Sequence, residues 1–282
     1  MKATAKSQRG DKGVRVFSVT SGKGGVGKTN VAVNLGLALI KLGRRVLLID
    51  ADLGLANVDI LLGLSPKHTL QDVLTGGMGI EDILVTGPDG IKILPAASGI
   101  QEITHLSSEQ QLLLLAEVDK LEDQIDIVLI DTSAGISHNV MFFNIAAQDI
   151  VVVVTPDPTS MTDAYALIKV LYQKYAEKSV YLLINQVVDE TEAKEIYKKI
   201  TAVCERFLHL SVGYLGFVEK DDKLVKSVRM QKPVIDAFPV SPSSRCFKKV
   251  ASDLLNIELD GRPKGNIQFL WKRLLRESTV KG

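Results

Sequence analysis

The sequence predicts an α/β fold: a doubly wound, mostly parallel sheet with helices on both faces. Short segments rich in Val, Ile and Leu do not alternate apolar with polar residues, which is typical of strands covered on both sides. Longer segments with helical spacing lie between them, and such alternation favours a parallel sheet. The predicted strands are residues 14–20, 45–50, 91–95, 125–131, 150–155, 180–185 and 212–217, and the clearest predicted helices are residues 28–42, 107–121, 158–174 and 191–207.

Composition limits the protein class. The chain has 282 residues and is 46% hydrophobic, enough for one large core or two small domains. A net charge of +1 argues against a molecule that is basic all over, as a general nucleic-acid binder would be. Cys204 and Cys246 lie far apart and form no CxxC pair, which suits a reducing cytosol. The polar N-terminus has no signal core and no apolar run approaches the roughly 20 residues of a membrane span, so we expect a cytoplasmic protein.

The loop after the first predicted strand fits two nucleotide-binding fingerprints. Its glycines match G-x-G-x-x-G, and Asp50 lies at a suitable distance for a ribose-binding carboxylate, which would indicate a dinucleotide enzyme. The same stretch, GKGGVGKT at residues 22–29, also matches the P-loop pattern G-x-x-x-x-G-K-[ST]. Lys28 offers a cation for the β- and γ-phosphates and Thr29 a hydroxyl for Mg²⁺, and a dinucleotide pyrophosphate needs neither. The P-loop interpretation is therefore favoured.

A P-loop binds phosphate through backbone N–H groups, which glycines expose, and through the positive end of the following helix. The loop follows an apolar strand and opens an apolar helix, the context that the pattern requires. The residues predicted to hold the nucleotide here are Gly22, Lys23, Gly24, Gly25, Val26, Gly27, Lys28 and Thr29.

Lys23, at the second position, is not required by an ordinary P-loop. The phrase KGGVGKT resembles the deviant Walker A motif of the cell-division and partition ATPases, the MinD/ParA family. Three further stretches resemble the same family: VLLIDADLGLANVDILLG its switch I, DIVLIDTSAGI its Walker B strand and switch II, and LLINQV a late strand. The resemblance covers residues 14–256, and the wording DADLGLANVD is similar to the branch that regulates flagellar number and placement.

The resemblance implies a P-loop NTPase of the SIMIBI class that binds ATP and Mg²⁺ and hydrolyses ATP. It implies a monomer without ATP and a sandwich homodimer with it, in which Lys23 reaches across to the partner's ATP. Lys28 would hold phosphates and Asp52 would orient the attacking water, so that Lys23, Lys28 and Asp52 form the catalytic set. The remaining implied roles are Mg²⁺ binding by Thr29, with Asp50 and Asp131 holding its waters, and adenine recognition by Asn185.

The chain departs from the family at two places. Glu219 stands where the family often has a proline, which leaves the contacts to the base there open. Residues 1–12 lack the DQAxxLR motif with which some flagellar members stimulate a GTPase of the signal-recognition type, and this puts direct stimulation in doubt. The partners implied by the resemblance are this flagellar GTPase, FlhF, the flagellar switch-complex proteins, or a flagellar transcription regulator.

The C-terminal end reads as a separate unit. Residues 1–13 are expected to be a flexible N-terminus, residues 14–257 the ATPase domain, residues 258–266 a linker and residues 267–282 a membrane-binding tail. In the tail, Ile267, Leu270, Trp271, Leu274 and Leu275 share one helical face, with Lys272, Arg273 and Arg276 on the other. Residues 262–282 carry a net charge of +5, which leaves −4 for residues 1–261.

A basic amphipathic helix with a tryptophan suits an anionic membrane, so we expect peripheral attachment to the cytoplasmic face of the cell membrane. An ordinary helix docked on the body is the alternative.

Other functions are weighed by the same residues. A DNA-partition ATPase would need a basic face on the body, whose cations look dispersed along the sequence, so no direct DNA binding is expected. An iron–sulfur carrier would need paired cysteines. A scaffold that binds ATP without hydrolysing it, and a role in septum placement rather than in flagella, both stay open.

Overall fold

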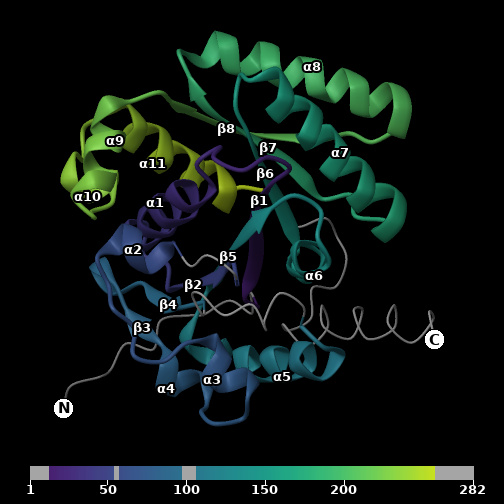
Figure 1. Ribbon diagram of the computed structural model, residues 1–282. Coiled ribbons are helices and arrows are strands. Elements are labelled where there is room, and N and C mark those ends of the chain that lie inside the picture. The colour runs from purple at the N-terminus through teal and green to yellow at the C-terminus, as the bar shows by residue number, and fades with distance from the viewer. Residues whose placement is uncertain (1–12, 54–56, 97–105, 258–282) are drawn as a thin grey trace, which may run out of the picture.

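The computed structural model describes residues 13–53, 57–96 and 106–257, and within them it forms an eight-stranded sheet (Figure 1). The strand order is β3-β4-β2-β5-β1-β6-β7-β8. Neighbouring strands in the described part are parallel except at the edge, where β3 runs antiparallel to β4. The strands are β1 (Arg15–Ser21), β2 (Val46–Ala51), β3 (Val85–Thr86), β4 (Lys92–Leu94), β5 (Ile127–Ala134), β6 (Asp149–Val154), β7 (Val180–Val187) and β8 (Gly213–Glu219).

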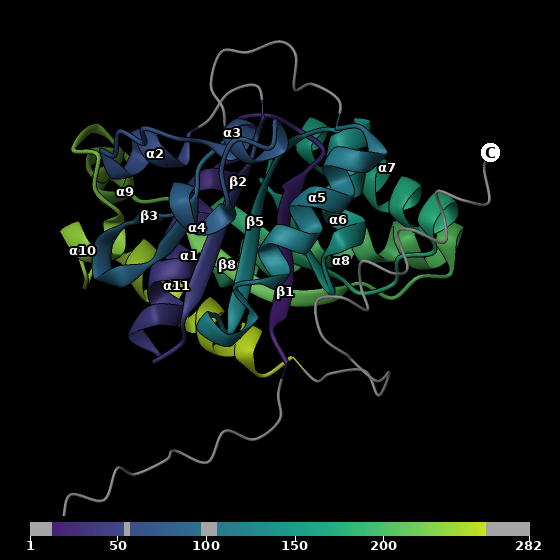
Figure 2. The same ribbon diagram turned by 90° about the horizontal axis from the view of Figure 1, so that it is seen from below.

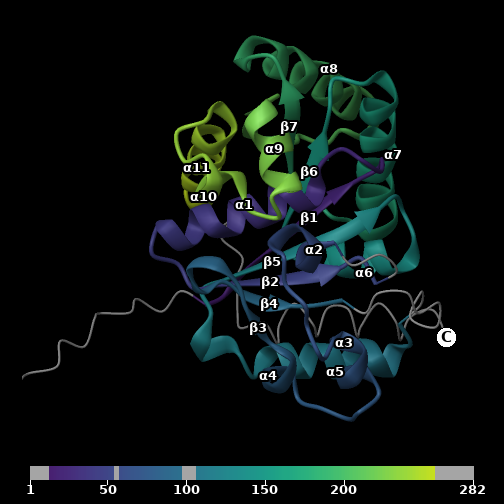
Figure 3. The ribbon, with the colours of Figure 1, turned by 60° about the vertical axis from the view of Figure 1, so that its left-hand side comes forward.

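Helices cover both faces of the sheet, as Figures 1 and 3 show. One face is covered by α1 (Lys28–Lys41), α2 (Val58–Leu62), α9 (Asp222–Arg229), α10 (Val234–Ala237) and α11 (Pro242–Leu255). The other is covered by α3 (Leu70–Leu74), α4 (Ile80–Ile83), α5 (Ser108–Asp119), α6 (His138–Ala146), α7 (Pro158–Tyr175) and α8 (Glu190–Leu208). Successive side chains of a strand point to opposite faces of the sheet: on β5, Leu129 packs against the helices of the first face and Ile130 against those of the second. The predicted fold class is therefore confirmed.

The predicted strands all exist, with ends displaced by up to three residues. The largest difference concerns Asp131: we expected it at the end of its strand, but β5 continues to Ala134. The two-residue edge strand β3 and the short helices α2, α3, α4 and α10 were missed, because segments of two to five residues carry too little periodicity to be recognised. The linker, the tail and residues 1–12 lie outside the described residues.

The site is positioned by β1, which lies between β5 and β6 near the centre of the sheet (Figure 3), and Figure 2 shows it beside β5. The helix after β1, α1, covers one face of the sheet, and the helix after the neighbouring β5, α6, covers the other. In open α/β sheets, ligands bind at the carboxyl ends of the strands beside such a reversal. Cys204 and Cys246 are buried free thiols, and burial raises the pKa of Cys204 to about 11. No helix within the described ranges is long and apolar enough to cross a bilayer.

Candidate nucleotide-binding site

The glycine-rich loop joins the carboxyl end of β1 to the first turn of α1. Gly27 is the N-cap of this 14-residue helix and has a left-handed backbone, with φ of 89°. The positive end of the helix dipole therefore lies directly beside the loop, and this favours an anion there. The predicted P-loop thus has the strand–loop–helix context on which its interpretation depended.

The glycines of the loop serve two different purposes. A Cβ at Gly22 would collide with the backbone carbonyl of Asp163 in α7, and a Cβ at Gly27 would lie 2.7 Å from the side-chain nitrogen of Asn185. Gly24 and Gly25 are exposed, and a Cβ on either would meet no described atom within 4 Å. The outer glycines are thus needed for packing, while the inner two leave room for a phosphate group to approach the backbone.

Asn185, near the end of β7, binds the backbone of the phosphate loop. Its amide nitrogen donates to the carbonyl of Val26 at 2.7 Å, and its side-chain oxygen accepts from the backbone N–H of Gln186 at 3.0 Å. Gln186 has a positive φ of 62°, an uncommon backbone for a residue other than glycine. The sequence did not reveal this contact, which joins positions 159 residues apart. Adenine recognition by Asn185 stays a prediction.

Lys28 and Thr29, in the first turn of α1, lie close to Asp131. Asp131 lies on β5 and is almost wholly buried, and its carboxylate is hydrogen-bonded by the Thr29 side chain. Burial, together with the neighbouring Asp50 carboxylate, raises the pKa of Asp131 to about 8 against the lowering effects of Thr29 and Lys28. Burial also lowers the pKa of Lys28, although Asp131 and Asp52 oppose this. Two buried carboxylates this close together cannot both stay ionised at neutral pH unless a positive charge compensates them.

Asp50 and Asp52 come from the end of β2. Asp50 is buried and accepts from the backbone N–H groups of Asp52, Asn57 and Val58, at 3.1, 3.1 and 3.2 Å. These bonds lower its pKa, but burial outweighs them and raises the pKa to about 6. Asp50 therefore ties the end of β2 to the start of α2. Asp52 is half-buried and is close enough to Lys28 to raise the pKa of the lysine.

The donors at this point fit Mg²⁺. One oxygen of Asp131, Oδ1, is buried and has no hydrogen-bond partner among the described residues, and the Thr29 hydroxyl lies beside the same carboxylate. Oxygen ligands of this kind are those that Mg²⁺ prefers. In the described ranges no group of three His, Cys, Asp or Glu side chains could hold a metal ion by itself. An ion here would take most of its ligands from water and phosphate.

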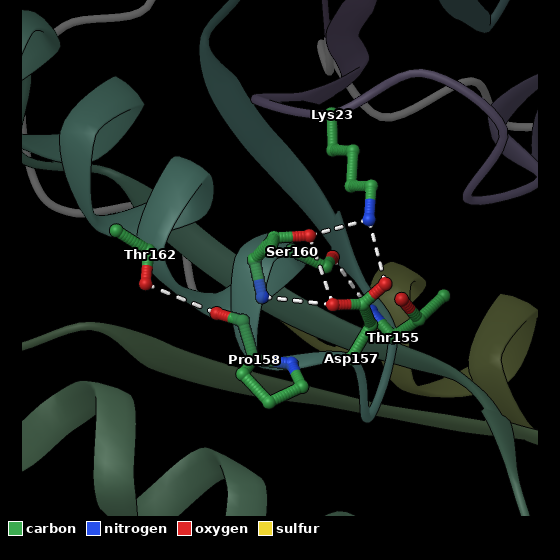
Figure 4. A network of polar contacts seen from close by, with 7 residues as sticks. Lys23, Thr155, Asp157, Pro158, Ser160 and Thr162 are labelled. Atoms are coloured by element: carbon green, nitrogen blue, oxygen red, sulfur yellow. Dashed lines mark hydrogen bonds and ion pairs between the residues drawn. The ribbon is translucent and has the colours of Figure 1, made fainter.

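Lys23 turns away from the phosphate loop and lies on α7 (Figure 4). Its Nζ forms an ion pair of 2.6 Å with Oδ2 of Asp157 and a hydrogen bond with the Thr159 hydroxyl. Asp157 is the N-cap of α7, accepting from the Thr159 N–H at 2.8 Å, and chiefly the Lys23 hydrogen bond lowers its pKa to about 2. The Asp157-Pro158 pair is a recognisable helix start, but nothing in the sequence linked it to Lys23.

Fold and site together define a class: P-loop nucleotide-binding proteins with a second lysine in the loop. A family model described as an AAA domain matches residues 14–184. The antiactivator FleN of Pseudomonas aeruginosa is 46% identical over 263 residues, covering 93% of this chain and 94% of FleN. The flagellum site-determining protein YlxH of Helicobacter pylori is 31% identical over 266 residues, covering 93% of this chain and 90% of YlxH.

Among solved structures, the septum site-determining protein MinD of Pyrococcus horikoshii, complexed with Mg-ADP, has a TM-score of 0.69 and 27% identity. The match covers 86% of this chain and 96% of that MinD. The chain belongs to the MinD/ParA family of P-loop ATPases. The FleN and YlxH matches also confirm the resemblance to the flagellar branch that the switch I wording predicted.

Proposed function

We propose that the chain is a Mg²⁺-dependent ATPase switch, monomeric without ATP and dimeric with it, that binds the membrane reversibly and regulates flagellar number or placement. The observation that carries this proposal is the position of Lys23. A lysine in the phosphate loop lies 35% exposed on α7, away from the phosphate cradle of its own chain. There it is available to a second chain that approaches the carboxyl ends of the central strands.

Each residue of the site has a physical role in the proposal. Lys28 and the amides of Gly24, Gly25 and Gly27 would hold the phosphates. Thr29 and Asp131 would hold a Mg²⁺ ion, whose charge would balance that of the phosphate oxygens. Asp52 orients the water, and Lys23 of each protomer supplies positive charge to the other's nucleotide. Phosphoryl transfer needs mainly such positioning and neutralisation, so this set is sufficient.

The flagellar assignment is supported by two relatives, the antiactivator FleN and the flagellum site-determining protein YlxH. The alternative, septum placement, is supported by the MinD structure. A role in DNA partition is a further alternative within the same family. Counting flagella and minicells in cells that lack the protein distinguishes them: altered flagellar number or position with normal division supports the proposal, and minicells with normal flagella contradict it.

Deleting residues 267–282 should abolish ATP-dependent binding to anionic vesicles and leave ATP binding unchanged. A single short amphipathic helix binds a bilayer weakly, whereas two helices in a dimer bind with avidity. Sedimentation with vesicles, with and without MgATP, measures the effect. A second variant replaces Trp271 and Leu274 by serine in the full chain; it keeps the length and charge of the tail and should also lose binding, because the apolar face is removed. Equal sedimentation of full-length and truncated protein would contradict membrane attachment through the tail.

A further inference from the structure

The basic residues of the body are concentrated near its C-terminal end. Residues 1–261 carry a net charge of −4, yet residues 220–257 contain eight cations against four carboxylates, a net charge of +4. This corrects the expectation that the cations of the body are dispersed. The eight cations are all exposed: Lys220, Lys223, Lys226, Arg229, Lys232, Arg245, Lys248 and Lys249.

Four of these cations contact one short segment, residues 238–240, which leads from α10 to α11. From α9, the Nζ atoms of Lys223 and Lys226 lie 5.1 and 5.9 Å from the centroid of the Phe238 ring. From α11, Arg245 donates to the carbonyl of Val240 and Lys248 to that of Pro239, each at 2.8 Å. We call Lys223, Lys226, Arg245 and Lys248, with the segment that they surround, the basic face.

The charge of this face is not neutralised within the described part of the chain, where none of the four cations forms an ion pair with a carboxylate. Two of the four acids in residues 220–257 are engaged elsewhere: Asp221 accepts from Ser243 at 2.6 Å, and Asp236 pairs with Lys41 at 2.9 Å. The other two, Asp222 on α9 and Asp253 on α11, form no ion pair among the described residues. An ammonium group has three N–H donors, so each lysine keeps donors for another acceptor. A cluster of unpaired cations on an otherwise acidic body fits an anionic partner.

Exposed aliphatic side chains accompany the cations. Val240, inside the face, is 79% exposed, and Val225 and Met230 on α9 are 51% and 45% exposed. Phe238, by contrast, is half-buried beneath the two lysines, so its ring is not open for a nucleic-acid base to stack on. Cations interspersed with protruding aliphatic groups fit a lipid surface, where phosphates lie above hydrocarbon. The chain also passes from α11 directly into the segment that carries the basic tail.

We propose that the basic face is a second membrane contact, which binds the phosphates of anionic lipid headgroups and places Val240 at the interface. The inference rests on the proposed peripheral attachment and adds a contact made by the folded body. Each basic residue close to an anionic surface contributes about a fivefold factor in affinity. Salt screens this contribution over roughly 10 Å at 0.1 M.

The test uses the full chain with MgATP and phosphatidylcholine vesicles, with or without phosphatidylglycerol. Replacing Lys223, Lys226, Arg245 and Lys248 by glutamine together should weaken binding to the phosphatidylglycerol vesicles by at least about tenfold. The salt dependence of the remaining binding should also become shallower. A second variant, Val240→Ser, keeps the charge and should weaken binding severalfold. ATP binding and thermal unfolding show whether the variants are folded.

The matched control replaces four exposed lysines of α7 and α8 by glutamine, which removes the same charge: Lys169, Lys174, Lys198 and Lys199. A loss no greater than in this control overturns the basic face while leaving attachment through the tail intact. Failure of the unaltered chain to bind phosphatidylglycerol vesicles removes the proposed membrane attachment altogether. If the unaltered chain binds double-stranded DNA, and the basic-face variant loses this binding but still binds vesicles as before, the face is assigned to nucleic acid instead.

Discussion

Replacing Lys23 with alanine should leave ATP binding nearly unchanged and abolish ATP-dependent dimerisation, with ATP turnover reduced at least about a hundredfold. A cation supplied in trans acts on the transferring phosphoryl group, and removing such a group in related chemistry costs on the order of 10³-fold or more. Lys23 makes its described side-chain contacts with α7, so its loss leaves the phosphate cradle of its own chain in place. Sedimentation velocity with a non-hydrolysable ATP analogue and steady-state phosphate release measure the two effects.

Asp157→Asn is the matched control for Lys23. Asparagine remains a good N-cap for α7, so the helix start is preserved, while the ion pair that holds Lys23 is removed. Because an exposed ion pair contributes little, dimerisation should be unchanged or slightly easier. Equal self-association and turnover of wild type and Lys23→Ala would show that the switch does not operate, and only a nucleotide-binding protein would remain.

Asp52→Ala should lower steady-state phosphate release by about a hundredfold or more, because positioning a water and accepting its proton contributes on that order. ATP binding and the ATP-bound dimer should persist, and the dimer should accumulate since turnover no longer dissolves it. Asp52 follows β2 directly and is close enough to Lys28 of the loop to raise the pKa of that lysine. Phosphate release under saturating MgATP, with dimer content measured in parallel, checks both expectations.

The control for this variant is Asp59→Ala. Asp59 lies on the neighbouring helix α2, so the change removes the same charge from the same region without touching the end of β2. Its turnover should match that of the wild type. If Asp52→Ala releases phosphate as fast as Asp59→Ala, Asp52 has no part in hydrolysis, and the scaffold interpretation gains weight.

The parallel sheet and the phosphate loop could both be predicted from the sequence. Unbroken runs such as 150–154 are apolar on both sides because both faces of each strand are covered, and this pattern needs no knowledge of strand order. The loop is similarly local: its glycines, Lys28 and Thr29 are contiguous, and the helix that follows begins with them. The family resemblance added roles for Lys23, inside the same loop, and for Asp52, in the switch I stretch.

What only the tertiary structure decided are the contacts between distant residues. The sheet order brings β7 and α7 against the loop, so that Asn185 holds Val26 and Asp157 holds Lys23 across separations of 159 and 134 residues. It also gathers the lysines of α9 and the cations of α11 around residues 238–240, a spatial grouping that the order of residues along the chain does not reveal. A sequence pattern records which faces are buried and which loops are tight, since these follow from neighbouring residues. Which side chains from distant segments come into contact depends on the order of the strands in the sheet. Hydrophobic burial is non-directional, so the apolar pattern of a single strand does not specify that order.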